Sequence, residues 1–149
     1  MSEPVRVLIV AHKTATSEPL LEAVRARAKR GPAQFSLLVP RQQPHGKRKL
    51  VDAVGLHDDD EALRALNEAL PKLSEAAGQE VTGSLGVPGP MTAIENEIAG
   101  GDYDEIMIST LPRRMSRWLK SDLVSKAQGL GLPVTHVESA ENLIGVPSS

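Results

Sequence analysis

The stretch between residues 104 and 122 has the composition of an anion-binding loop. It opens with the apolar run Ile106-Met107-Ile108, which we expect to be a buried strand. The polar turn after this run supplies the candidate ligand-binding residues Ser109, Thr110, Pro112, Arg113, Arg114 and Ser116. Hydroxyl groups, guanidinium groups and the free N–H groups at the start of the next helix all donate hydrogen bonds to phosphate. Alternatively, Ser116 only caps that helix and the arginines belong to a solvated turn.

A second polar turn, near the N-terminus, would complete the same site. His12, Lys13 and Thr14 follow residues 5–11, an apolar and β-branched run typical of a strand covered on both faces. Ligands of parallel sheets bind beyond the carboxyl ends of the strands, where the winding direction reverses. If the first and fourth strands are neighbours there, the two turns form one ligand-binding site although they are far apart in sequence.

The chain between these turns alternates between expected strands and expected helices, as parallel α/β domains do. Strands are expected at residues 5–11, 35–39, 81–87, 106–108 and 132–137. Helices are expected from Thr16 or Ser17 toward Arg30, from Asp58 to Gly78, from Pro90 to Gly100 and from Ser116 to Gly129. Apolar spacing places these helical residues in the core: Leu20, Leu21, Val24, Ala28, Leu63, Leu66, Leu70, Leu73, Ala77, Ile94, Ile98, Leu119, Leu123 and Ala127. The pattern predicts a three-layer α/β sandwich.

Three further segments lack the spacing of a known site. Gly83, Gly86 and Gly89 are not followed by Lys-Ser/Thr, so we interpret them as sites of close backbone approach instead of a phosphate loop. Residues 41–49 are basic and rich in turn formers, and form either a solvated loop or a segment that reaches over a phosphate. The aspartates at 58–60 favour a helix start, and we predict no metal site.

Length, charge and composition limit the number of domains and the classes of partner that this chain could have. We expect a single domain over residues 1–149. The formal charge of -2 and the presence of only three aromatic side chains, Phe35, Tyr103 and Trp118, argue against nucleic-acid binding. The chain has no cysteine, which excludes a disulfide framework. It shows no leader peptide and no run of membrane-spanning length, so we expect a cytoplasmic protein without a membrane partner.

This order of elements resembles the universal stress protein family over nearly the whole chain. The local likeness runs from Tyr103-Asp-Glu-Ile-Met-Ile-Ser109 to Leu132-Pro-Val-Thr-His-Val137, where that family has a hydrophobic strand, a ligand loop, a helix and a Pro-Val strand. The resemblance implies a Rossmann-like fold, expected here as a five-stranded parallel sheet of order 3-2-1-4-5 with helices on both faces. It implies ATP or another adenine nucleotide as the candidate ligand, with no cofactor required. It also implies a homodimer through the last strand, at Val134, Thr135, His136 and Val137.

The sequence departs from that family at the nucleotide loop. ATP-binding members carry Gly-x-x-Gly, then about nine residues, then Gly-Ser/Thr, and these small residues let the backbone approach the phosphates. Here Ser109 and Pro112 occupy the two glycine positions, and Ser121-Asp122 stands where Gly-Ser/Thr would. The first strand ends in Ala11-His12 instead of an acidic residue. Either hydroxyls and arginines have replaced glycine amides around an anion, or nucleotide binding has been lost.

Three functions follow from these observations. The first is a non-catalytic, stress-response-type domain that binds a nucleotide or another phosphorylated small molecule at the carboxyl ends of strands one and four. The second is a ligand-free dimeric interaction module of the same fold, because edge strands carry unpaired backbone groups that invite pairing. The third is a small hydrolase or phosphoryl-transfer enzyme using His12, although the sequence has no Gly-x-Ser-x-Gly elbow. We favour the first and predict no catalytic residues.

Overall fold

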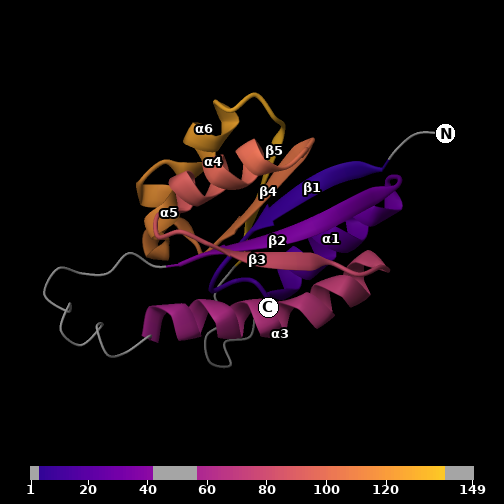
Figure 1. Ribbon diagram of the computed structural model, residues 1–149, viewed down its shortest axis with the longest axis horizontal. Coiled ribbons are helices and arrows are strands. Elements are labelled where there is room, and N and C mark those ends of the chain that lie inside the picture. Colours follow the sequence, from indigo (N-terminus) through magenta and orange to yellow (C-terminus); the bar gives the residue numbers. More distant parts are fainter. Residues whose placement is uncertain (1–3, 42–56, 140–149) are drawn as a thin grey trace, which may run out of the picture.

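The centre of the fold is β1 (Val5–Val10), which pairs with β2 (Ala33–Pro40) on one side and with β4 (Glu105–Thr110) on the other. β3 (Thr82–Gly86) and β5 (Val134–Glu138) lie at the two edges. All pairings are parallel, and the order is β3-β2-β1-β4-β5 (Figure 1). This computed structural model describes residues 4–41 and 57–139. It confirms the predicted sheet and strand order.

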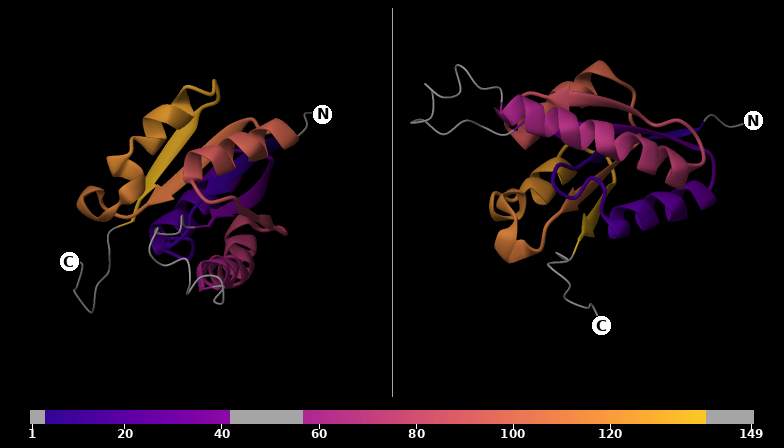
Figure 2. Two further views of the ribbon diagram at one scale, coloured as in Figure 1. Left: turned by 60° about the vertical axis from the view of Figure 1, so that its left-hand side comes forward. Right: turned by 90° about the horizontal axis from the view of Figure 1, so that it is seen from below.

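Helices cover both faces of the sheet (Figure 2). α1 (Glu18–Lys29) and α3 (His57–Ala77) pack on one face. α4 (Pro90–Gly100), α5 (Arg117–Lys120) and α6 (Leu123–Gln128) lie over the other. The arrangement is the three-layer Rossmann-like sandwich that the sequence predicted.

The side chains of β1 alternate between the two core layers, one on each face of the sheet. Val7 and Ile9 pack with residues of α1 and α3, whereas Leu8 and Val10 pack with residues of α4 and α6. All four side chains are fully buried. Successive side chains of a strand point to opposite faces, so a strand covered on both sides must be apolar at every position. The polar residues of the site come at the carboxyl end of β4, at Ser109 and Thr110, and in the turn after β1.

The predicted helix from Ser116 to Gly129 is two helices, so that prediction was wrong. α5 ends at Lys120 and α6 begins at Leu123. Between them Asp122 adopts φ 61° and ψ 36°, a left-handed conformation that cannot continue an α-helix. The break makes α5 a single turn over the carboxyl edge of the sheet.

The buried stripe of α3 is rotated from the predicted one. Ala62, Leu66, Ala69 and Leu73 are its buried residues, and Leu63 is 44% exposed. Ala62 and Ala69 are small enough to let the helix approach the sheet closely, and Leu63 falls on the flank of that stripe. Assigning Leu63 to the core was therefore wrong.

Among the described residues, no helix combines the length and the apolar character needed to cross a membrane. The predicted basic segment at 41–49 lies outside the described residues, apart from Arg41.

Candidate ligand-binding site

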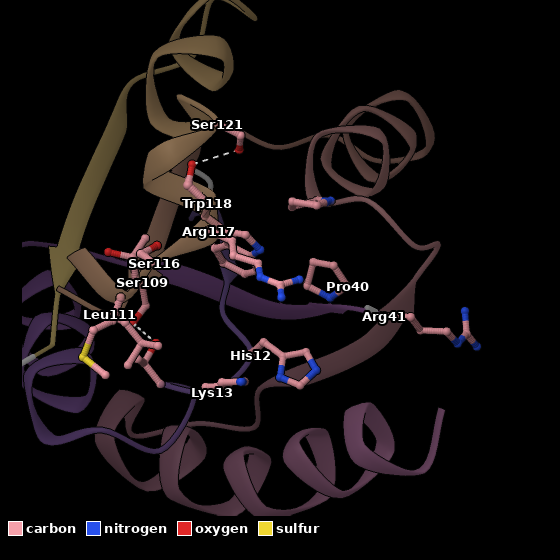
Figure 3. A pocket seen from close by; sticks show the side chains of 14 residues that line it. His12, Lys13, Pro40, Arg41, Ser109, Leu111, Ser116, Arg117, Trp118 and Ser121 are labelled. Atoms are coloured by element: carbon pink, nitrogen blue, oxygen red, sulfur yellow. Dashed lines mark hydrogen bonds between the residues drawn. The ribbon is translucent and has the colours of Figure 1, made fainter. Parts of the chain in front are cut away.

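A cavity of about 400 Å³ opens at the carboxyl edge of the sheet, between the turns that follow β1 and β4 (Figure 3). Six of the nine predicted ligand-binding residues line it: His12, Lys13, Thr14, Ser109, Thr110 and Ser116. β1 and β4 are neighbours in the sheet, so their carboxyl ends bring together two turns that are remote in sequence. The predicted meeting of these turns is confirmed.

A hydrogen bond between hydroxyls ties the two turns together. Thr14 Oγ1 lies 2.6 Å from Ser109 Oγ, and the two residues are 95 positions apart. Both are buried, at 5% and 1% exposure. The turn after β1 is braced further along by Ser17, whose Oγ accepts from the Leu20 N–H at 3.3 Å as the N-cap of α1. The hydroxyl end of the cavity is therefore held by both the sheet and a helix cap.

Three cationic side chains line the cavity: Lys13, Arg41 and Arg117. Lys13 and Arg117 are exposed, and Arg41 is half-buried. Figure 3 shows Arg41 at the opposite end of the cavity from Ser109. The backbone N–H and Nη1 of Arg41 both donate to the Gly86 carbonyl oxygen, each at 3.1 Å, which anchors this side chain between the ends of β2 and β3.

Gly86 is required for that anchor. A Cβ at this position would lie 2.7 Å from Ala93 Cβ of α4 and 3.0 Å from Leu38 Cδ1. A Cβ at Gly83 would lie 2.5 Å from Leu66 Cδ1 of α3. The distances of 2.7 Å and 2.5 Å are shorter than a carbon–carbon contact allows. The interpretation as sites of close approach is confirmed for Gly83 and Gly86, and Gly89 precedes α4 with φ 99°.

An apolar wall completes the cavity. Its members are Pro40, Pro90, Leu111, Met115 and Trp118. Trp118 is half-buried and packs against the core layer of β4 and α6. In Figure 3, Trp118 and Arg117 lie across the cavity from His12 and Lys13. Pockets for small organic ligands combine such apolar surface with a few placed polar groups.

Three predicted residues need separate comment. Pro112 and Arg114 are not among the described residues that line the cavity, and Arg114 is exposed. Arg113 belongs to the 3₁₀ turn Arg113–Met115, and its side chain lies outside the described part of the structure. Ser116 Oγ accepts from the Leu119 N–H at 3.1 Å, so Ser116 caps α5 as well as lining the cavity. With four residues, α5 is too short to supply the predicted helix-dipole contribution.

Sequence reasoning missed the contributions of β2 and α5. Pro40 ends β2, the strand beside β1, so the rule that parallel strands end at one edge could have found it. Arg41 follows β2 and was predicted only as part of the basic segment 41–49 that could reach over a phosphate. The other missed lining residues follow Ser116 in the chain: Arg117, Trp118 and Ser121. They line the cavity and Arg114 does not because of the geometry of the 3₁₀ turn and α5, which the sequence does not show.

The described lining is rich in hydrogen-bond donors. Lysine, arginine and hydroxyl groups point to an acceptor-rich, anionic ligand. Over residues 4–41 and 57–139, no group of three or more His, Asp or Glu side chains is arranged to hold a metal ion.

Comparison with solved structures identifies the known fold that this chain shares. No protein-family model matches the sequence, and no curated protein matches it. UspA from Lactobacillus plantarum, a universal stress protein, superposes with a TM-score of 0.66 at 15% identity over 92% of this chain and 99% of that one. A universal stress protein family protein from Arabidopsis thaliana, with AMP bound, gives 0.62 at 13% identity over 98% and 97%. The universal stress protein from Archaeoglobus fulgidus in complex with dAMP gives 0.57 at 23% identity over 92% and 99%.

These similarities extend over nearly the full length of each protein compared. At 13 to 23% identity they show the fold, which is that of universal stress proteins. The fold implied by the resemblance in sequence is therefore confirmed.

Proposed function

We propose that this chain is a divergent member of the universal stress protein family that binds an adenine nucleotide or another phosphorylated small molecule in the cavity. The observation that carries the proposal is the cavity itself, in which three cationic side chains and a cluster of hydroxyls face an apolar wall. Proteins of the same fold with AMP and dAMP bound support a nucleotide as the ligand.

Each part of the cavity has a role in this proposal. Thr110 and Ser116 donate hydrogen bonds to phosphate oxygens at the hydroxyl end, with Lys13 and Arg117 neutralising charge. Pro40 and Trp118 provide apolar surface for a base or another planar group. In this arrangement side-chain donors do the work that glycine amides do in family members with the Gly-x-x-Gly loop. Ser109 and Pro112 stand at those glycine positions. In this proposal they change which groups donate hydrogen bonds to the phosphate, while the ligand remains a phosphorylated small molecule.

The decisive experiment compares two neighbouring arginines by calorimetric titration with AMP, cAMP, ATP and inorganic phosphate. Arg117 lines the cavity and Arg114 does not, and both are exposed. We expect Arg117→Ala to weaken binding of the ligand by about 1 kcal/mol, or roughly fivefold, the size of an exposed charge pair. Arg114→Ala removes the same charge and serves as the matched control, with an effect below about twofold. No binding by any of the four compounds, or equal effects of both variants, would refute the proposal.

The proposal includes no catalytic step. Long incubation of the purified protein with ATP and cAMP should leave both compounds intact. A turnover that persists through repeated purification and disappears in His12→Ala would instead establish the hydrolase or phosphoryl-transfer alternative.

A dimer through β5 is the second candidate function, and the position of that strand favours it. β5 lies at the edge of the sheet, and Thr135 and His136 are exposed on it. Such an edge is suited to pair with a second copy across a two-fold axis. Light scattering should then give twice the mass of the chain, and His136→Pro, which removes a backbone donor that faces away from β4, should give the monomer. A monomeric wild type would rule this assembly out.

A further inference from the structure

Thr110 connects the cavity to the edge strand. Its Oγ1 lies 2.8 Å from Nε2 of His136 on β5. Thr110 is 2% exposed and lines the cavity, whereas His136 is exposed and is not among the described lining residues. Thr110 therefore borders the ligand space, and its hydroxyl contacts the imidazole of an exposed histidine.

The direction of this hydrogen bond decides what Thr110 offers to a ligand. A hydroxyl has one proton and two acceptor lone pairs. When Nε2 carries no proton, the Thr110 O–H donates to it and presents lone pairs elsewhere. When Nε2 carries a proton, the ring donates to Oγ1, and the hydroxyl proton is free to point at an anion in the cavity. Protonation of His136 fixes the second arrangement, because both ring nitrogens are then donors.

We propose that His136 is a positioning residue, which orients the Thr110 hydroxyl so that the cavity binds an anion more tightly when His136 is protonated. This inference rests on the proposed function, because it requires an anion in the cavity. The sign follows from the geometry: lower pH favours the imidazolium, the imidazolium frees the hydroxyl proton, and the hydroxyl then donates to the anion. Affinity should therefore rise as pH falls from about 8 to about 5.5, the range in which histidine ordinarily titrates.

Other charged groups lie on the elements that pack against β5, and their charges also affect the affinity for an anion. β4 contributes Glu105, which is paired with Arg27 of α1 at 3.0 Å. α6 contributes Lys126, and β5 itself carries Glu138. The remaining charged residues of α1 are exposed: Glu18, Glu22, Arg25 and Lys29. Carboxylate, lysine and arginine side chains ordinarily keep one charge between about pH 5.5 and 8, so such groups shift the affinity without giving it a histidine-like profile.

The test is a calorimetric titration with cAMP at several pH values from about 5.5 to 8. cAMP is a phosphodiester and lacks the second phosphate ionisation near pH 6 that would distort a titration with AMP. Wild-type protein should bind about threefold to tenfold more tightly at the acid end, the range of a single hydrogen bond. In His136→Gln the amide still donates to Oγ1 but does not titrate, so the affinity should be nearly independent of pH.

Three further variants separate a positioning role from simpler explanations. Thr110→Val removes the hydroxyl and should weaken binding and flatten the pH profile, and Thr110→Ser should restore both. His12 is an imidazole that lines the cavity itself, so His12→Gln should change the affinity while leaving the acid-side gain in place. A purely structural role of His136 would lower the affinity by the same factor at every pH.

The outcomes distinguish this inference from the proposed function. A pH-independent affinity in the wild type, or an acid-side gain that survives in His136→Gln or Thr110→Val, overturns the role of His136 and leaves ligand binding intact. If none of AMP, cAMP, ATP and inorganic phosphate binds the wild type at any pH, both the inference and the proposed function are refuted. As a direct check, the ¹⁵N spectrum of His136 Nε2 at a fixed pH near 6.5 should move toward the protonated form when cAMP is added, because linkage is reciprocal.

Discussion

The hydrogen bond between Thr14 and Ser109 gives the sharpest prediction for the stability of the site. Replacing either partner alone, with Thr14→Val or Ser109→Ala, leaves one buried hydroxyl without its partner. The loss combines the net value of the hydrogen bond, about 1 kcal/mol, with the cost of an unsatisfied buried group. We expect each single variant to lower the free energy of unfolding by about 1 to 3 kcal/mol.

The double variant is the informative one. When both partners become apolar, no buried hydroxyl is left unpaired, so the double variant should be less destabilised than the sum of the two singles, by about 1 kcal/mol or more. For a chain of this size each kcal/mol corresponds to roughly 2 to 4 °C in Tm. Urea unfolding followed by the fluorescence of Trp118, the only tryptophan, measures all four proteins under the same conditions.

Strict additivity of the two single effects would refute the reasoning, because it would mean that the two hydroxyls do not interact. Thr16→Val is a matched control. Thr16 lies in the same turn and is half-buried, and this substitution should change the free energy of unfolding by less than about 0.5 kcal/mol.

Three further predictions concern the surrounding fold. Gly86→Ala should force α4 and β3 apart and lower the free energy of unfolding by about 1 to 3 kcal/mol. It should also weaken ligand binding, because the Gly86 carbonyl oxygen accepts the hydrogen bonds that hold Arg41. Unchanged urea unfolding and unchanged affinity would contradict this prediction. Glu105→Gln removes the charge that pairs with Arg27 through two 3.0 Å hydrogen bonds, and should cost about 2 kcal/mol in the same assay, while an effect below about 0.5 kcal/mol would show the pair to be dispensable. Burial raises the pKa of Tyr103 above its ordinary value near 10, so its stabilising effect is present below about pH 10 and is lost as pH rises through the folded pKa. Because the chain has a single tyrosine, tyrosinate absorbance in an alkaline titration measures this directly, and a midpoint at or below 10 would contradict the shift.

The sheet could be read from sequence because its signals are local. An apolar run at β1 and another at β4 each define a strand covered on both faces, and Ser17 and Pro19 mark the start of α1. The carboxyl ends of parallel strands share one edge, so the turns after β1 and β4 were expected to meet once the resemblance implied that these strands are neighbours, as the structure confirms.

Local signals failed where neighbouring elements decide the conformation. The spacing of Leu119, Leu123 and Ala127 fits one helix, but Asp122 adopts a left-handed conformation and splits it, a change that leaves the apolar spacing intact. The rotation of α3 that exposes Leu63 is likewise set by how closely a helix can pack on the sheet, which its apolar spacing does not encode.

The sequence by itself determined the five strands and the two polar turns, because these depend on residue periodicity. The strand order that brings the two turns together was implied by the resemblance to universal stress proteins and confirmed by the structure. Only the tertiary structure decided which side chains line the cavity. Arg117 enters and Arg114 does not because a 3₁₀ turn sets the direction of α5, and Thr110 meets His136 because of the register between β4 and β5. Direction and register are relations between segments, and they are fixed when the elements pack.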